Sequence, residues 1–519
     1  MRLPVRLLTV LLSLAPVAAG AAPKPLEKFV PRNADAVLVI PSLETFAKQG
    51  KALFDVVVGF PGAGKLRDGR AVIRGRLGFD LLGPESMREA GLDPRRGAVL
   101  YVIASGDTWE GSPTEGALVV PIANAARFEA TLAAICKEQL TRAVRTVLPG
   151  SPKVVVWRGK GPREEVAYAI TGGHAVIGME HAAARRVRKT LAIPASGHLG
   201  TTPAYRKMSA ALGSELAALG FLPPGSKLLD EQPMLRGGAS FGFGGSAERA
   251  RVVWVYPLTE GGKRAVAEAT DPRAFLNKLD PGASIVVHTG IDLRAIVPRE
   301  SFGTGNKERT PEKRERWDAY YDALGPGMAL GLRLAPLEEG APVPSAVKEP
   351  LALLQGELVL GLSDPEGMKR TLREMMNGAS AEDGPWVVPE SGGELGFHVQ
   401  DGRLVFAVGP SGTMRALAQR RRSSFSPPSD AAAAALRSKL GGGYVDVEGI
   451  VAGLRGLSDT VFRDTAKAEE QRAKLEQVLS LLSRIRVASF TAEPVGDAVR
   501  AEVVVELAPE GEHGEWGEN

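Results

Sequence analysis

The chain has 519 residues, of which 44% are hydrophobic and 24% charged, as is typical of globular proteins rather than of disordered or fibrous ones. This length predicts two or more domains. The formal net charge is only +4 and charges of both signs are interspersed, so the composition gives no indication of nucleic-acid binding.

Residues 1–21 have the three regions of a secretory signal peptide. Arg2 and Arg6 form a basic region, Leu7–Leu14 is mostly apolar, and small residues up to Ala21 offer a cleavage site. The apolar region is too short to span a bilayer, and no second long apolar run follows. We therefore expect an exported, soluble chain without a transmembrane segment, periplasmic or extracellular after cleavage near Ala21.

One segment of the chain occurs twice. Residues 115–136 and 355–376 match by residue type at a constant offset. Each predicts a short apolar strand and then a helix, with Asn124 or Asp364 as the helix cap. Apolar residues follow at the spacing of one helix face, at Phe128, Leu132, Ile135 and Cys136 and again at Met368, Leu372, Met375 and Met376. The face stays apolar while its residues change, as a duplicated packing unit requires.

Flanking segments recur in the same order. The strand pattern of residues 31–43 returns at 281–293, and the hairpin pattern of residues 239–256 returns at 488–505. Between them, each copy has a meander of short strands. Glycine-containing turns, Gly172-Gly173 in the first copy and Asp401-Gly402 in the second, favour antiparallel pairing of these strands.

These repeats predict the domain organisation. Residues 1–21 are the signal peptide, 22–260 a first α+β unit, 261–508 a second, and 509–519 a disordered acidic tail. We expect the two units to be tandem and similar, each a mostly antiparallel sheet with helices packed on one face.

Two further helices have no counterpart in the other copy. Residues 311–324 predict a charged helix that ends before Gly325 and buries Trp317, Tyr320, Tyr321 and Leu324. Residues 464–482 predict a longer helix whose apolar stripe packs on the second sheet or, as the alternative, on a partner helix. The stripe consists of Leu475, Val478, Leu479 and Leu482.

Residues 59–66 come close to the phosphate-binding pattern G-x-x-x-x-G-K-[ST]. Leu66 stands where the pattern needs the hydroxyl that holds magnesium. The preceding apolar residues have helical spacing, so no strand leads into the loop, and residues 67–70 are a poor helix start. We therefore interpret the glycines as a turn between helices and assign no nucleotide or other cofactor.

Ser240 lies in a G-x-S-x-G string, which in a nucleophile elbow joins a strand to a helix. Here a second strand is predicted to follow, and the corresponding Ser489 of the second copy has no flanking glycines. His288 and Asp292 come downstream in the wrong order for the usual triad. The string therefore favours an ordinary strand of small residues.

Other residue types with catalytic potential also favour structural roles. The six histidines (174, 181, 198, 288, 398 and 513) show no metal-ligand spacing, so no metal site is assigned. Asp292 and Asp446 each end a strand where a helix begins, and capping explains both. The single cysteine, Cys136, is either a reactive thiol or, as its apolar counterpart Met376 favours, a buried core residue.

Four segments together carry a resemblance. They are Pro281–Leu293, Leu358–Leu372, Phe397–Gly409 and Gly442–Ile450. In these patterns the chain resembles a broad group of exported bacterial proteins of unknown function built from repeated α+β units. The resemblance implies no catalytic residues. The chain departs from the group in lacking an obvious membrane anchor, and its first copy has no clear match to residues 444–446.

We expect a non-enzymatic, exported protein that is a binding module or is associated with the cell envelope. Its partner would be a protein or an apolar ligand, bound where the two units join. The alternatives are a secreted serine hydrolase that uses Ser240 and a carrier that holds an apolar ligand between sheet and helices. No catalytic, cofactor-binding or metal-ligating residue is assigned.

Overall fold

The computed structural model describes residues 26–58, 64–104, 114–161, 163–213, 216–226, 237–246, 248–295, 299, 310–335, 352–375, 385–390, 392–419, 425–461 and 468–508. The predicted signal peptide and the predicted acidic tail lie outside these residues. Contacts within the chain divide it into two compact units, with the boundary between Pro257 and Leu258. Both units combine helices with a large antiparallel sheet, so the fold class is α+β.

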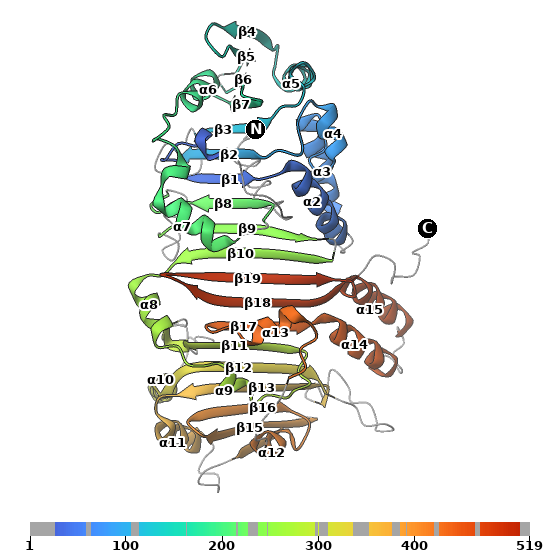
Figure 1. Cartoon of the computed structure of the whole chain (residues 1–519). Helices are drawn as coiled ribbons and strands as arrows, with labels where there is room; N and C mark the ends of the chain where they lie inside the picture. The colour runs from blue at the N-terminus through green and yellow to red at the C-terminus, as the bar shows by residue number, and fades with distance from the viewer. Residues whose placement is uncertain are drawn as a thin grey trace. The chain divides into compact units, whose positions relative to one another are not determined.

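The sheet of the first unit is drawn in blue to green in Figure 1. Its strands are β1 (Ala36–Ile40), β2 (Ala98–Ala104), β3 (Thr114–Pro121), β4 (Val144–Leu148), β5 (Val154–Arg158), β6 (Glu165–Thr171), β7 (His174–Met179), β8 (Ala218–Leu222), β9 (Ala239–Ser246) and β10 (Arg249–Pro257). Their order across the sheet is β4-β5-β6-β7-β3-β2-β1-β8-β9-β10, and every pairing is antiparallel.

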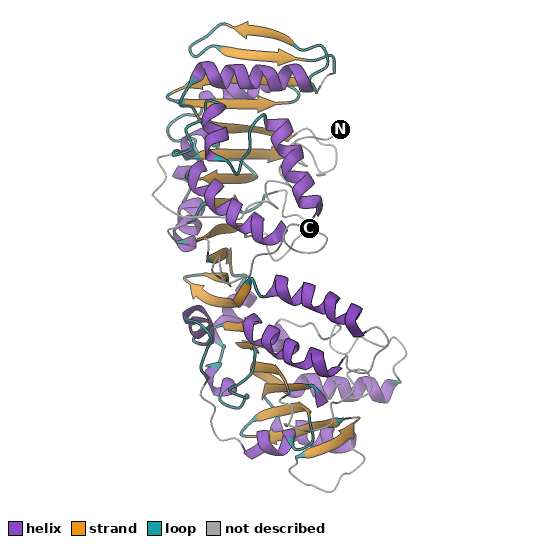
Figure 2. Cartoon of the chain, turned by 90° about the vertical axis from the view of Figure 1, so that its right-hand side faces the viewer, coloured by secondary structure: helices purple, strands orange, loops and turns teal. Residues whose placement is uncertain are grey.

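Helices cover both faces of this sheet. The helices are α2 (Leu43–Val58), α3 (Gly64–Leu77), α4 (Pro84–Glu89), α5 (Ala125–Gln139), α6 (Ala183–Leu191) and α7 (Pro203–Leu212), with short 3-10 helices η1 (Leu26–Phe29) and η2 (Leu199–Thr201). Val37 and Val119 face a core that includes α6 and α7. Ala98 and Val120 face the opposite core, beneath α2, α4 and α5. Figure 2 shows helices lying across the near face of these strands.

The expectation of helices on one face is therefore wrong. Its physical reason is visible in β1, where all five residues are apolar and four of them are buried. Strand β5 likewise buries Val154 through Trp157 without alternation. A strand with one solvent-exposed face alternates apolar and polar residues, whereas a strand buried on both faces consists of a continuous apolar run.

The second unit is drawn in yellow-green to red in Figure 1. Its strands are β11 (Ile285–Asp292), β12 (Leu324–Leu334), β13 (Leu354–Leu362), β14 (Trp386–Glu390), β15 (Gly393–Gln400), β16 (Arg403–Gly409), β17 (Gly441–Asp446), β18 (Ile485–Val495) and β19 (Ala498–Leu507). Their order is β14-β15-β16-β13-β12-β11-β17-β18-β19, again with antiparallel pairing throughout.

Helices also cover both faces of the second sheet. They are α8 (Glu260–Ala267), α9 (Arg273–Leu276), α10 (Pro311–Ala323), α11 (Pro365–Met375), α12 (Thr413–Gln419), α13 (Asp430–Leu436), α14 (Val447–Val461) and α15 (Ala468–Leu482), with the 3-10 helix η5 (Leu293–Ala295). Val286 and Val359 share a core with α9, α12 and α13. Leu360 and Leu404 share the opposite core with α10 and α11.

The predicted caps and turns are confirmed. The Asn124 side chain accepts a hydrogen bond from the backbone N–H of Arg127 at 3.0 Å, and Asp364 accepts one from Gly367 at 2.8 Å. Both residues of the Gly172-Gly173 turn and of the Asp401-Gly402 turn have positive φ. Two consecutive positive φ values match the right-handed twist of a hairpin, and Gly and Asp tolerate them.

Two side-chain predictions for the second unit are wrong. Trp317 of α10 is 37% exposed, although Tyr321, one turn later, is buried. Helix α15 packs beside α14, and Val478 of its predicted apolar stripe is exposed while Leu479 is buried. Within the described residues, no helix is both long enough and apolar enough to cross a membrane.

Candidate functional site

A surface hollow of about 650 Å³ lies between α2 and α3 of the first unit. Its lining combines apolar side chains, arginines and one carboxylate: Phe54, Val58, Arg70, Ala71, Arg74, Gly75, Gly78 and Asp80. The two helices are adjacent in the sequence, and residues 59–63 between them lie outside the described residues. The small side chains of α3 leave the space that forms the hollow.

Arg70 is held on the wall of the hollow by two neighbours. Its guanidinium carbon lies 5.1 Å from the centre of the Phe54 ring. Its Nη2 and Nε donate to the Asp80 carboxylate at 2.6 and 3.4 Å. Burial alone would raise the pKa of Asp80, but hydrogen bonds from Arg70 and from the backbone of Leu82 outweigh it and lower that pKa. Asp80 is therefore a carboxylate committed to an ion pair.

Arg74 supplies the uncommitted charge of the hollow. It is exposed, lies one turn after Arg70 on the same helix, and has no ion-pair partner among the described residues. An apolar floor with a neighbouring cation suits a ligand that has an apolar body and an anionic group. The described lining contains no Ser, Cys or His that could act as a nucleophile or general base.

A second candidate is a buried polar cluster in the second unit. Glu357 on β13 and Asp280, in the loop after α9, are 2% and 9% exposed. Gln355 donates to Glu357 at 3.0 Å and to Asp280 at 3.4 Å, and Arg333 of β12 donates to Asp280 at 3.0 Å and to Gln355. The backbone N–H of Asp280 also donates to Glu357. These internal partners fix the loop on the sheet and leave the cluster a structural role.

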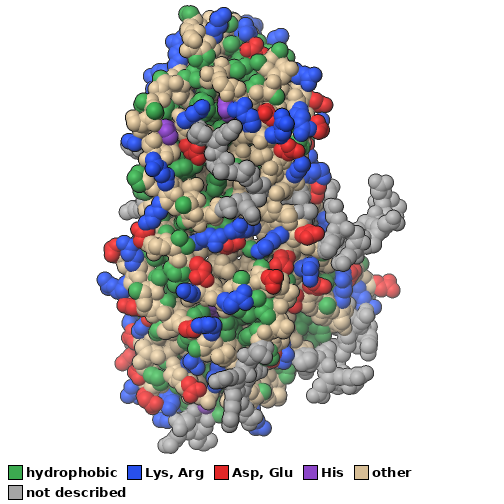
Figure 3. Space-filling view, in the orientation of Figure 1, with side chains coloured by type: hydrophobic (Ala, Val, Ile, Leu, Met, Phe, Trp, Pro, Cys, Tyr) green, Lys and Arg blue, Asp and Glu red, His purple; other side chains and the backbone are tan. Residues whose placement is uncertain are grey.

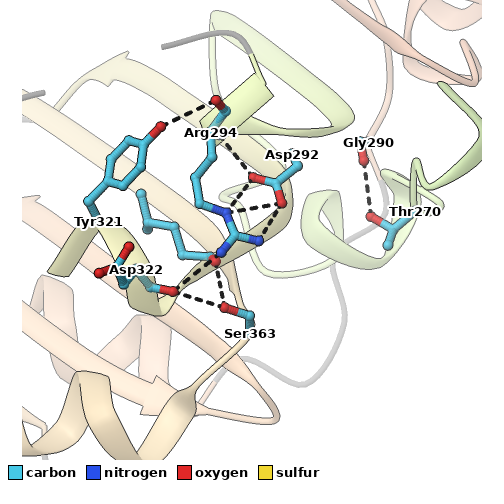
Figure 4. Close-up of polar contacts among 8 residues, drawn as sticks. Thr270, Gly290, Asp292, Arg294, Tyr321, Asp322 and Ser363 are labelled. Carbon is cyan, nitrogen blue, oxygen red and sulfur yellow. Dashed lines mark hydrogen bonds and ion pairs between the residues drawn. The ribbon is translucent and has the colours of Figure 1, made fainter. Parts of the chain in front are cut away.

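Figure 4 shows a third cluster, at the end of β11. Arg294 donates to the Asp292 carboxylate from Nε at 3.0 Å and from Nη2 at 2.6 Å, and from Nη1 to the carbonyl oxygen of Asp322 at 3.3 Å. The Tyr321 hydroxyl donates to the Arg294 carbonyl oxygen at 3.2 Å, and Ser363 donates to that of Asp322. In the same view, Thr270 donates to the carbonyl oxygen of Gly290.

This third cluster holds elements together rather than performing acid–base chemistry. Burial would raise the pKa of Asp292, but hydrogen bonds from the Arg294 side chain and backbone lower it overall. Asp292 also accepts from the backbone N–H of Arg294, and Asp446 accepts from that of Gly449 at 2.9 Å. Both aspartates therefore have the capping role that their positions in the sequence predict.

The glycine-rich segment 59–66 lacks the context of a phosphate-binding loop. Helix α2, not a strand, precedes it, and residues 59–63 lie outside the described residues. Helix α3 begins at Gly64, so the expectation of a poor helix start at residues 67–70 is wrong. Among the described residues, a helix follows this segment, but the strand that must precede a phosphate-binding loop is not there.

Ser240 does not occupy a nucleophile elbow. It lies within β9, between β8 and β10, and is 2% exposed. Strand β10, not a helix, follows. Its Oγ is buried and has no hydrogen-bond partner among the described residues. His288 belongs to the other compact unit, on β11.

The remaining predicted residues have structural surroundings. Cys136 is 1% exposed, and burial raises the pKa of its thiol to about 12, so it stays protonated. His288 Nε2 lies 2.9 Å from the carbonyl oxygen of Ala435. His174 lies against Arg96, at 3.1 Å from Nη2 to Nε2. No group of three or more potential metal ligands is found within the described residues.

No protein-family model matches the chain, and no curated protein matches it. Among solved structures, crystal forms I, III and IV of TP0453 are similar, with 13%, 10% and 10% sequence identity and a TM-score of 0.25. The matches cover 46% of this chain and 80%, 82% and 81% of the TP0453 chains. At that TM-score the similarity carries no argument about function.

Proposed function

We propose that the chain is an exported, non-enzymatic binding protein of the cell envelope, built from two tandem copies of one α+β unit. The first copy binds an amphipathic anion in the hollow between α2 and α3. Two sets of observations support this proposal: the correspondence of the two units, element by element, and the composition of the hollow.

The strand orders support the duplication. In the first unit, the order β5-β6-β7-β3-β2-β1-β8-β9-β10 becomes β14-β15-β16-β13-β12-β11-β17-β18-β19 in the second when each strand is replaced by its counterpart in chain order. Strand β4 is the one addition, at the edge. A shared order of nine antiparallel strands with two crossovers is hard to reach independently, because many other orders satisfy the same packing rules.

The helices support it as well. Helix α5 follows β3 and packs on the same face as α2, and α11 follows β13 and packs on the same face as α10. The opposite face of each sheet is covered by a second pair of helices. Helices α6 and α7 lie between β7 and β8 in the chain, and α12 and α13 lie between β16 and β17. Corresponding helices thus cover corresponding faces.

The hollow carries the functional part of the proposal. Phe54, Val58 and Ala71 offer apolar surface, while Arg70 and Arg74 place two guanidinium groups at its wall. Burying an alkyl chain there contributes about 0.8 kcal/mol per methylene group, and a guanidinium beside a carboxylate or phosphate adds a charge-assisted hydrogen bond. A fatty acid or another anionic amphiphile satisfies both requirements.

A fluorescence titration of the full chain with cis-parinaric acid tests this function. We expect saturable binding that weakens about tenfold in Arg74→Glu, a loss of about 1.4 kcal/mol. Arg249→Glu is the matched control, because Arg249 is exposed on β10 and the charge change is the same. Equal affinity of both variants, or no saturable binding by the unmodified chain, would overturn the assignment of the hollow.

A further inference from the structure

The β4–β5 hairpin forms an unusual edge of the first sheet. Strand β4 pairs with β5, and no other described strand pairs with it. Four of its five residues are exposed, among them Val144 at 63% and Val147 at 43%. These two valines are three residues apart, so they lie on opposite faces of the strand. The strand therefore extends beyond both helical layers.

The same hairpin is strongly basic. Residues 140–163 contain no Asp or Glu, and the carboxylate of Glu164, which follows them, accepts hydrogen bonds from Thr141. They contain six cations, all of them exposed: Arg142, Arg145, Lys153, Arg158, Lys160 and Arg163. Arg158 is paired with Glu165 of β6 at 2.9 Å. Figure 3 shows Lys and Arg side chains gathered over the end of the first unit where Figure 1 places β4 and β5.

The corresponding edge of the second unit is closed to a further strand. It is formed by β14, in which Pro389 has no N–H to donate and Glu390 adds a negative charge. Strand β4 contains no proline. The two edges of one repeated framework thus differ in whether their backbone can accept another strand.

We propose that β4 binds an acidic, extended segment of another protein, which adds to the sheet as an antiparallel strand. Backbone hydrogen bonds to the open edge give this mode its affinity, and the side chains on alternate faces give it its specificity. Val144 and Val147 would each contact an apolar side chain of the added strand. The surrounding cations favour acidic residues at the positions between.

Charge also decides against a second copy of this chain as the occupant. Pairing β4 with another β4 would bring Arg142 and Arg145 of both copies together, and like charges across strands are destabilising. Short edge strands that carry basic residues resist self-association for this reason. An anionic membrane surface would meet the cations, but it would make no use of the open backbone edge.

Fluorescence anisotropy with labelled peptides tests the proposal on the full chain. The probe is an extended peptide with two valines three residues apart, one for each face of the strand, and glutamates at the other positions. Two N-methylated versions serve as a matched pair, because each blocks the N–H groups on one edge of the peptide. We expect the unmodified peptide to bind and one of the two methylated versions to bind about tenfold more weakly, while the other retains affinity. The same peptide with lysine in place of each glutamate should not bind.

The double variant Lys153→Glu/Lys160→Glu tests the charge contribution, with Arg249→Glu as the control away from the hairpin. We expect the double variant alone to weaken peptide binding about tenfold and to reduce its salt dependence. Equal binding of both methylated peptides would overturn strand addition, as would preferential binding to phosphatidylglycerol vesicles. The proposal would also be overturned if the chain dimerised and the double variant altered that dimerisation, or if the chain bound no peptide.

Discussion

Apart from β4, the two units have the same strand order, and they differ in other elements. Between the first two strands, the first unit has α2, α3 and α4, and at its sheet edge it has β4. The second unit instead carries the helix pair α14 and α15 between β17 and β18. Between its own first two strands the second unit has η5 and α10 among the described residues. Both proposed binding features, the hollow and the open strand edge, therefore lie where the first unit differs from the second. The comparison teaches that binding is to be sought in the elements in which the units differ, rather than in the strand order that they have in common.

The cores of the units differ at a few matched positions. In the second unit, Glu357 pairs across strands with Gly331, which in turn pairs with Val286. In the first unit, Ala117 pairs with Tyr101, which in turn pairs with Val37. Glu357 therefore stands where the first unit has Ala117. By the same register, Arg333 corresponds to Ile103. The sequences of residues 276–281 (LNKLDP) and 26–31 (LEKFVP) align Asp280 with Val30. The first unit is apolar at all three positions.

Truncating the matched helix residues should have the largest effect. Phe128 of α5 and Met368 of α11 are 6% and 0% exposed at corresponding positions. Each alanine variant should destabilise its own unit by about 3–4 kcal/mol, because it removes buried contacts and leaves a cavity. Hydrogen exchange should show the lost protection within the unit that carries the change. Equal loss in both units would contradict their separate cores.

Breaking the polar cluster should cost somewhat less. Glu357→Ala removes the closer of the two acceptors of the Gln355 amide and the carboxylate that accepts from the N–H of Asp280, which should lower the stability of the second unit by about 2–3 kcal/mol. Replacing the cluster with the residues of the first unit, Asp280→Val/Arg333→Ile/Glu357→Ala, should cost less than Glu357→Ala alone. Hydrogen exchange of β13 measures both. A greater loss in the triple variant would break the correspondence of the positions.

The pH dependence of the second unit's stability should depend on His288. Burial lowers its pKa, so the folded unit keeps the ring neutral while the unfolded chain takes up a proton near pH 6.5. Below about that pH the unfolded state binds more protons, and the second unit loses stability as the pH falls. His288→Val introduces the residue type of Val39 at the matched position and should flatten this loss. An unchanged pH profile of hydrogen exchange in β11 would argue against it.

The smallest effect is expected at Ser240. Its Oγ is buried without a partner among the described residues, so Ser240→Ala should change the stability by less than about 1 kcal/mol, with a gain as the favoured sign. Ser489→Ala is the matched control in the second unit. Thermal unfolding and ester hydrolysis should both be measured. Loss of ester turnover in a folded Ser240→Ala protein would instead support the hydrolase alternative.

Local signals in the sequence predicted much of the framework. The caps at Asn124 and Asp364 and the two glycine-containing turns depend on neighbouring residues, so their patterns were sufficient. The placement of helices on both faces could also have been inferred from the unbroken apolar run of β1. The counterpart of Tyr444 in the first unit was not found from the sequence. Strand register shows that it is Phe221. The residues that follow differ, Val-Asp after Tyr444 and Leu-Pro after Phe221, so the two sequence patterns do not match.

The candidate site was out of reach of the same reasoning. The hollow exists because α2 and α3 lie beside each other, and no local pattern specifies that contact. The glycines of α3 made the segment a poor helix candidate, since glycine weakens a helix interior by about 1 kcal/mol relative to alanine. Arg70 and Arg74 were visible at helical spacing, but their distance from Phe54 depends on packing.

Native mass spectrometry of the full chain, isolated from the cells that produce it, tests the central claim most directly. The account predicts a co-purified anionic amphiphile that is retained in Arg249→Glu and lost in Arg74→Glu. A ligand-free spectrum for the unmodified chain, together with no saturable binding of cis-parinaric acid, would contradict it.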